Sequence, residues 1–202
     1  MKKTIVLLAM ILTSYCGMSQ TRDLTGGAGI PFGVPFDSIK VYMHDKHPDA
    51  KFYDYSSRGI NFMDGKFAGY KVLLWMFQAT KQTGVHTIMI CFDVEESNVY
   101  EAFDAVSAML DEKYGSHENI ERYDYPYTKQ DKGKFDESMY RLGKAHMNNY
   151  WKFNGSDPSM PDKHNYINVT ITKNFNVQVT YQDGPRVSKA SDMEKSKNIK
   201  DL

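Results

Sequence analysis

The feature that most constrains the fold is a stretch of unbroken helical spacing near the middle of the chain. Apolar residues recur on one helical face from Val99 to Leu110, with polar residues between them. Ser97 precedes this stretch as an N-cap candidate, and Gly115 follows it as a C-cap. We therefore predict an amphipathic helix over 98–114, the longest of the mature chain, which must bury its apolar face against other elements.

The segments on both sides of this helix have the patterns of antiparallel strands. The strands expected before it are 59–63, 66–77 and 85–92. Those expected after it are 120–125, 148–153, 167–171 and 177–181, the last two with clean apolar alternation. Asp64-Gly65 is typical of a tight turn, and Ile39 and Met43 indicate a short helix over 38–46.

These elements predict the α+β class, with an antiparallel sheet and two or three helices packed on one face. The order of one helix and then three strands occurs twice, which suggests a pseudo-repeat. We expect a single domain over 35–187, after an extended lead-in over 20–34. The charged segment 188–202 is expected to be a mobile tail or a loosely attached helix.

The N-terminal residues 1–19 have the pattern of a secretory signal peptide. Two lysines are followed by the apolar run Ile5–Leu12, which is too short to span a bilayer. Small residues at Gly17 and Ser19 favour cleavage before Gln20. The alternative is a lipoprotein anchored at Cys16, although the bulky residue before it does not suit lipidation.

The charge and cysteine content exclude several classes of function. Lys and Arg together number 25, as do Asp and Glu, and no basic stripe stands out, so nucleic acid is not an expected partner. No run after the signal peptide is long and apolar enough to cross a membrane. After cleavage only Cys91 remains, within the apolar run 87–92, so we expect a buried, unmodified thiol and no internal disulfide.

Motifs for catalysis or metal binding are weak. His44 and His47 share a helix face, but a metal site needs further ligands, and Asp49 is the only close candidate. The chain has no Gly-x-Ser-x-Gly motif, and the glycines of 26–29 lack the setting of a phosphate loop. The carboxylates of 93–96 fit a charged loop better than an acid–base site. We assign no catalytic residue, metal or cofactor.

The best candidate for a ligand-binding surface is aromatic. Tyr123, Tyr125 and Tyr127 alternate, so that they would line one side of a strand that runs into a loop. Trp151 lies in the next expected strand. Rings beside polar loops can hold sugar rings or the side chains of a partner, and they can equally be core packing. We name these four residues as the candidate site.

Two short segments resemble those of a group of exported proteins. Residues 32–39, Phe-Gly-Val-Pro-Phe-Asp-Ser-Ile, resemble a segment common in small uncharacterised exported proteins of Bacteroidota, and Leu110–Gly115 is also similar. The element order is similar to β-lactamase-inhibitor-like and outer-membrane-assembly-lipoprotein-like folds. This resemblance implies a non-enzymatic protein of the cell envelope, and it implies no functional residue.

The function that these observations favour is an exported interaction domain without catalysis, in the periplasm or at the cell surface. Its expected partner is a protein or glycan of the cell envelope. One alternative is a carbohydrate-binding module at the cell surface. The other is a hydrolase whose catalytic residues are dispersed along the chain.

Overall fold

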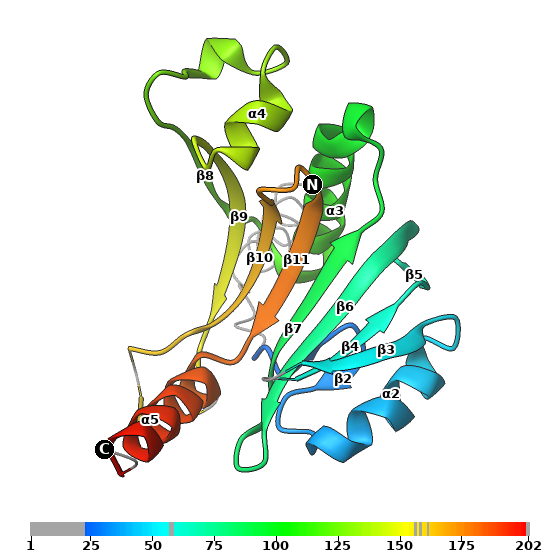
Figure 1. The fold of residues 1–202 in the computed structure, drawn as a ribbon, viewed down its shortest axis with the longest axis vertical. Helices are drawn as coiled ribbons and strands as arrows, with labels where there is room; N and C mark the ends of the chain where they lie inside the picture. The colour runs from blue at the N-terminus through cyan, green and yellow to red at the C-terminus, as the bar shows by residue number, and fades with distance from the viewer. Residues whose placement is uncertain (1–22, 57–58, 156, 158, 161, 201–202) are drawn as a thin grey trace, which may run out of the picture.

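One antiparallel sheet organises the molecule (Figure 1). The computed structural model describes residues 23–56, 59–155, 157, 159–160 and 162–200, so the expected signal peptide lies outside the described residues. The strand order is β3-β4-β6-β7-β11-β10-β9-β8, and the short β5 (Lys66–Phe67) pairs with β6. The other strands are β3 (Lys51–Ser56), β4 (Gly59–Met63), β6 (Tyr70–Thr80), β7 (Gly84–Phe92), β8 (Glu118–Tyr123), β9 (Ala145–Phe153), β10 (Asn165–Ile171) and β11 (Val177–Gln182).

The chain forms this sheet from two halves with the same element order. Helix α2 (Ile39–Lys46) precedes β3, β4, β6 and β7, and helix α3 (Val99–Tyr114) precedes β8, β9, β10 and β11. The halves join where β7 pairs antiparallel with β11, at Ile90 opposite Val179. The α+β class is confirmed, but each half has four long strands and not the three of the suggested repeat, and one strand of the first half was not expected. That strand is β3, which has no alternation to detect because Lys51–Tyr55 are all exposed.

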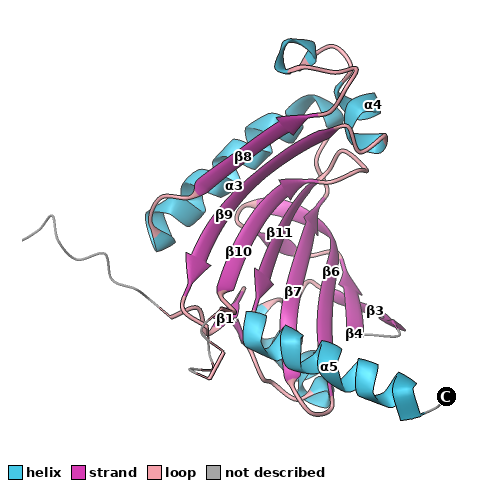
Figure 2. Cartoon of the chain, turned by 90° about the vertical axis from the view of Figure 1, so that its left-hand side faces the viewer, coloured by secondary structure: helices cyan, strands magenta, loops and turns pink. Residues whose placement is uncertain are grey.

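One face of the sheet forms the core, beneath α2 and α3. Successive residues of a strand point to opposite faces, and the buried set on this face includes Trp75, Phe77, Ile88 and Ile90. Figure 2 shows α3 behind the curved sheet. The expected helix face is confirmed by buried residues that all belong to α3: Val99, Ala102, Phe103, Val106 and Leu110.

The Gly-rich segment before α2 also belongs to this core. It folds into the short hairpin of β1 (Gly26–Gly27) and β2 (Ile30–Pro31), and the Leu24 and Ile30 side chains are buried. A Cβ atom on Gly27 would lie 2.3 Å from the Tyr181 ring, so glycine lets this backbone approach the sheet. The expected lead-in therefore packs on the domain and does not merely precede it.

The C-terminal helix α5 (Gly184–Lys200) has 17 residues, one more than the 16 of α3, so the expectation that α3 would be the longest helix was wrong. Its start is fixed by the buried Asp183, whose Oδ1 accepts from the Arg186 backbone N–H at 3.0 Å. The Asp183 Oδ2 atom accepts from the Arg186 guanidinium at 3.0 Å. Residues 188–200 thus form a helix, which lies across one end of the second sheet face (Figure 2).

Shorter elements complete the fold. These are α4 (Asp136–Arg141) and the 3₁₀ turns η1 (Phe36–Ser38), η2 (Glu96–Asn98) and η3 (Lys129–Asp131). The two-residue hairpin turn is at Ala68-Gly69, between paired Phe67 and Tyr70, and not at Asp64-Gly65. Asp64-Gly65 still bends the chain with positive φ angles of 63° and 90°. None of the helices in the described part of the chain is long and apolar enough to cross a membrane.

Candidate functional site on the open sheet face

The structure does not bring the four predicted site residues together. Tyr123 on β8 lies opposite Ala145, whereas Trp151 lies six residues further along β9, opposite Ile167. At about 3.3 Å per residue this separation is about 20 Å. The Trp151 side chain is only 3% exposed, and its Nε1 donates to the Gly115 carbonyl at 2.7 Å and to Asp111 Oδ1 at 3.1 Å. Trp151 therefore packs in the core and ties β9 to the end of α3.

The three tyrosines have different environments. Strand β8 ends at Tyr123 and the chain turns, because the Tyr127 N–H donates to the Asp124 carbonyl. Alternation therefore does not continue to Tyr127. The Tyr125 side chain is 90% exposed, and the other two are half-buried. Burial and a hydrogen bond to Glu121 raise the Tyr123 pKa, so this hydroxyl remains a donor.

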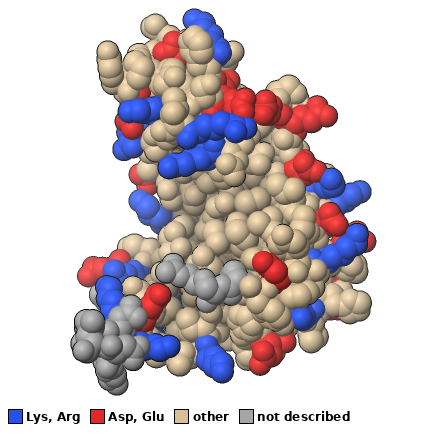
Figure 3. Space-filling model, in the orientation of Figure 1, with Lys and Arg blue, Asp and Glu red and all other residues tan. Residues whose placement is uncertain are grey.

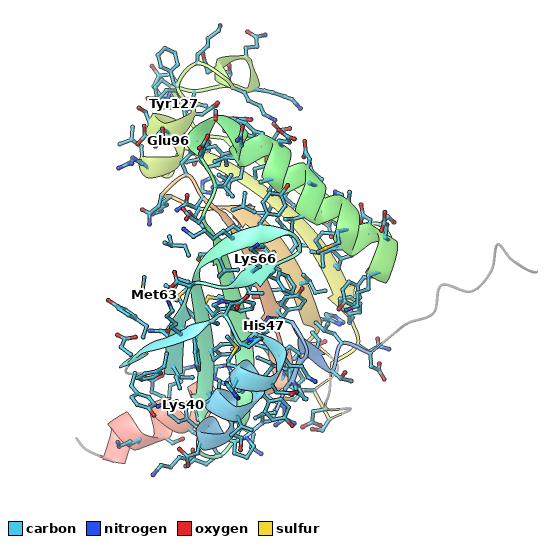
Figure 4. The ribbon with its side chains drawn as sticks, turned by 90° about the vertical axis from the view of Figure 1, so that its right-hand side faces the viewer. Lys40, His47, Met63, Lys66, Glu96 and Tyr127 are labelled. Atoms are coloured by element: carbon cyan, nitrogen blue, oxygen red, sulfur yellow. The ribbon has the colours of Figure 1, made fainter. Side chains whose placement is uncertain are left out.

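The two histidines of α2 also have different environments. His44 is exposed, whereas the half-buried His47 ring packs on Trp75 with centroids 4.4 Å apart. The His47 Nε2 atom lies 2.8 Å from the Ala28 carbonyl oxygen. Figure 4 shows His47 at the end of α2 that lies beside the sheet. No group of three or more possible metal ligands was found among the residues that the structure describes.

The candidate site that the structure presents is the second face of the sheet, which we call the open face. Along the five central strands, β6, β7, β11, β10 and β9, its side chains are uncharged apart from Lys71 near the start of β6 and Lys152 near the end of β9, with histidines at His86 and His146. Figure 3 shows a broad, hollowed area without charged side chains, with Lys, Arg, Asp and Glu around its rim. An accessible sheet face with few charged residues suits the binding of an uncharged surface.

The half of the open face on β4, β6 and β7 contains a group of five apolar side chains beside the polar Asn61 and Gln78, and we call this group the methionine row. Its cross-strand pairs are Met63 with Leu74, Leu74 with Cys91, and Met76 with Met89. All five side chains are half-buried, so each retains accessible apolar surface. Methionine suits such a surface because its flexible thioether adapts to different partners.

Cys91 belongs to this row and not to the core. Cys91 was expected to be buried and is half-buried, because alternation along β7 sends Ile90 and Phe92 inward and Cys91 to the open face. The Sγ atom lies 3.3 Å from Gln178 Oε1, within hydrogen-bonding range. Partial burial raises the pKa of the thiol to about 11, so it stays protonated and weakly nucleophilic at neutral pH.

The half of the open face on β9, β10 and β11 carries amides and hydroxyls. We call it the amide row, and its members are Asn148, Asn168, Thr170, Gln178 and Thr180. Beside it, the Tyr150 and Tyr166 rings meet edge-to-face at 6.2 Å, and the Tyr166 hydroxyl donates to Gln182 Oε1 at 2.8 Å. These groups offer donors and acceptors without net charge.

Helix α5 divides the end of the open face into two hollows. One, of about 660 Å³, lies beside Tyr150, Tyr166 and Gln182. The other, of about 670 Å³, lies beside Gln78 and His86. Burial lowers the His86 pKa, so its imidazole is neutral at neutral pH. The hollows extend the open face beneath the flanks of the helix.

Sequence reasoning missed this face because the runs 72–77 and 88–92 are apolar throughout. Such runs predict strands buried on both faces. Among the described residues, the inward positions hold Trp75, Phe77 and Ile90, while methionines and Cys91 alternate with them. The signal that could have revealed this face is the type of residue at the outward-facing positions. These positions hold methionine and leucine in the first half of the sheet and amides in the second half.

No protein-family model, curated protein sequence or solved structure matches this chain.

Proposed function

We propose that the chain is an exported, non-enzymatic binding module that docks another polypeptide on the open face. The observation that carries the proposal is the methionine row, five adjoining apolar side chains that remain partly accessible on a sheet face with few charged residues. Contiguous accessible apolar surface marks interaction sites. The N-terminal pattern of residues 1–19 supports export.

The test is a selection with an unconstrained phage-displayed peptide library on the chain that begins at Gln20. We expect enriched peptides to bind in solution and to lose about tenfold or more in affinity to the Met89→Lys variant, which places a charge in the methionine row. Leu142→Lys is the matched control, because Leu142 is 65% exposed on a surface remote from the row. Thermal unfolding must show that both variants remain folded.

Two results would reject a polypeptide ligand on this face. One is a library that yields no binding peptide. The other is a set of peptides that bind the folded Met89→Lys variant as tightly as the unchanged chain. Intact-mass analysis of the native protein tests export separately, since cleavage before Gln20 and lipidation at Cys16 give different masses.

A second candidate function, binding of a neutral glycan, is favoured by the amide row and the Tyr150–Tyr166 pair. Amides and hydroxyls can bond sugar hydroxyls, while a ring face packs on the sugar. Native electrophoresis through gels that contain a neutral polysaccharide distinguishes the two functions. Retardation that is lost in Tyr166→Ala and retained in Met89→Lys would favour the glycan.

A further inference from the structure

The two edge strands of the sheet occupy equivalent places in the two halves but differ in chemistry. Strand β8 carries Glu118, Glu121 and Arg122, and ion pairs with Lys152, Lys129 and Asp124 flank it. Charged side chains of this kind discourage pairing with another strand. Strand β3 reads Lys-Phe-Tyr-Asp-Tyr-Ser, with three aromatic residues among six. The first edge carries three charged residues, whereas the second carries two, Lys51 and Asp54, and three rings.

The rings of β3 form an exposed ledge that is already ordered. Phe52 is 43% exposed and Tyr55 is 56% exposed, and their centroids lie 5.1 Å apart. Phe36 stacks on Tyr55 at 5.7 Å. The Lys40 ammonium lies 3.8 Å from the Phe52 centroid and 4.8 Å from that of Tyr55. A partner that packs here would therefore order few additional side chains of this chain.

The backbone of β3 is paired on one side. In the described structure, its only partner strand is β4, and Lys51–Tyr55 are all exposed. The outer side thus leaves amide N–H and carbonyl groups for an added strand. The register shifts between Phe52 and Asp54, and the bulged Tyr53 is 60% exposed. A bulge bends and twists an edge, which limits how far pairing can extend.

The size of this edge favours a short segment over a whole second copy of the chain. Stable protein interfaces bury about 1,200–2,000 Å² in total. Six residues of strand span about 20 Å, which gives one extended peptide a short stretch of pairing on either side of the bulge but supplies only a small part of a dimer interface.

We propose that β3 accepts an extended segment of a partner protein as an added strand, with alternate apolar side chains packed on the Phe52–Tyr55 ledge. Main-chain hydrogen bonds supply affinity, and the ledge supplies selectivity. The ledge lies on the other face of the sheet from the methionine row, since Phe52 pairs with the buried Phe62 whereas Met63 of the row pairs with Lys51. It lies at the opposite end of the molecule from Tyr127, as Lys40 shows in Figure 4.

The experiment uses a phage-displayed octapeptide library in which alternate positions are Val, Ile, Phe or Tyr. Selection on the chain that begins at Gln20 should yield peptides that bind it in solution. Binding should weaken by about tenfold or more in the Phe52→Lys and Tyr55→Lys variants. Methylation of alternate backbone nitrogens in the same peptide should abolish binding, since it removes the donors that pair with β3.

Two control variants locate the site. Ile120→Lys alters the equivalent edge β8, where Ile120 is 45% exposed, and Met89→Lys alters the open face. Both should bind the peptide as the unchanged chain does, and thermal unfolding should confirm that all variants are folded. Loss of binding in Met89→Lys with retention in Phe52→Lys would overturn the proposal for β3 but support the open face.

Three other results would overturn the proposal. The first is a library that yields no binder, and the second is equal binding of the methylated peptide. The third is a concentration-dependent dimer in sedimentation that Phe52→Lys abolishes, which would assign the edge to a second copy of the chain.

Discussion

Asn149 joins three elements of the fold through one buried side chain. Its Nδ2 donates to Ser107 Oγ on α3 at 2.8 Å, and its Oδ1 accepts from Asn119 Nδ2 on β8 at 2.7 Å. Ser107 in turn donates to the Phe103 carbonyl. The Asn149 residue is only 3% exposed, so its removal takes a partner from the buried Ser107 hydroxyl and from the Asn119 amide, whose residue is exposed.

We expect Asn149→Ala to lower the free energy of unfolding by about 2–3 kcal/mol. Asn148→Ala is the matched control, since this neighbour is half-buried on the open face, and it should change stability by about 0.5 kcal/mol or less. Urea denaturation measures both variants. Equal decreases in the free energy of unfolding of the two variants would show that the hydrogen bonds of Asn149 do not stabilise the fold.

The Cys91 thiol provides a second prediction at the residue scale. Its pKa is raised to about 11 by burial, so the thiolate is a minor species at neutral pH. Below that pKa the thiolate fraction, and with it the labelling rate, should rise about tenfold for each unit of pH. Stopped-flow labelling of the folded protein with a disulfide reagent measures the rate. Fast labelling that does not change with pH would contradict the raised pKa.

The spatial arrangement of the candidate site residues is the part that the sequence predicted least well. Tyr123, Tyr125 and Tyr127 share a period of two in sequence, but the strand ends at Tyr123. Trp151 is an aromatic residue in the expected strand, yet its partners Gly115 and Asp111 come from the end of α3. A local pattern can predict a strand, whereas exposure depends on contacts that are distant in sequence.

At the scale of elements, α5 is attached mainly through its first turn. Asp183 is buried and pairs with Arg186, whose guanidinium also donates to the Thr83 carbonyl at 2.8 Å. By contrast, residues 191–197 are all exposed. The strength of attachment therefore falls along the helix.

We expect deletion of residues 191–202 to change the free energy of unfolding by about 0.5 kcal/mol or less, as for other exposed positions. Asp183→Ala should lower it by about 1–3 kcal/mol, because it removes a helix cap and leaves polar partners unsatisfied. Chemical denaturation of both variants tests this order. A deletion that costs more than Asp183→Ala would show that the second half of α5 contributes to the fold.

Element prediction succeeded where one face of an element is buried. The α3 face and the β10–β11 hairpin were confirmed because apolar alternation records burial directly. Strand β3 was missed because Lys51–Tyr55 are exposed. The helical state of 188–200 was left open because its charged sequence has little apolar periodicity, and the Asp183–Arg186 interaction fixes its start.

At the scale of the whole molecule, the β7–β11 pairing makes the two halves one continuous sheet. The chain has two tryptophans, and each half contains one, Trp75 on β6 and Trp151 on β9. We expect a single cooperative unfolding transition. The variants Trp75→Phe and Trp151→Phe each retain one tryptophan, whose fluorescence reports on one half. In each variant the unfolding midpoint measured by fluorescence should coincide with the midpoint measured by circular dichroism. Separate midpoints within one variant would show that the halves unfold independently.

The central claim is that the open face holds a polypeptide partner, and Cys91 reports on that face directly. The measurement is the labelling rate of Cys91 with and without a saturating amount of a peptide that binds the unchanged chain but not Met89→Lys. A peptide that covers the methionine row should slow labelling by about tenfold or more, because it excludes the reagent from the thiol. An unchanged rate with the peptide fully bound would contradict docking on the open face.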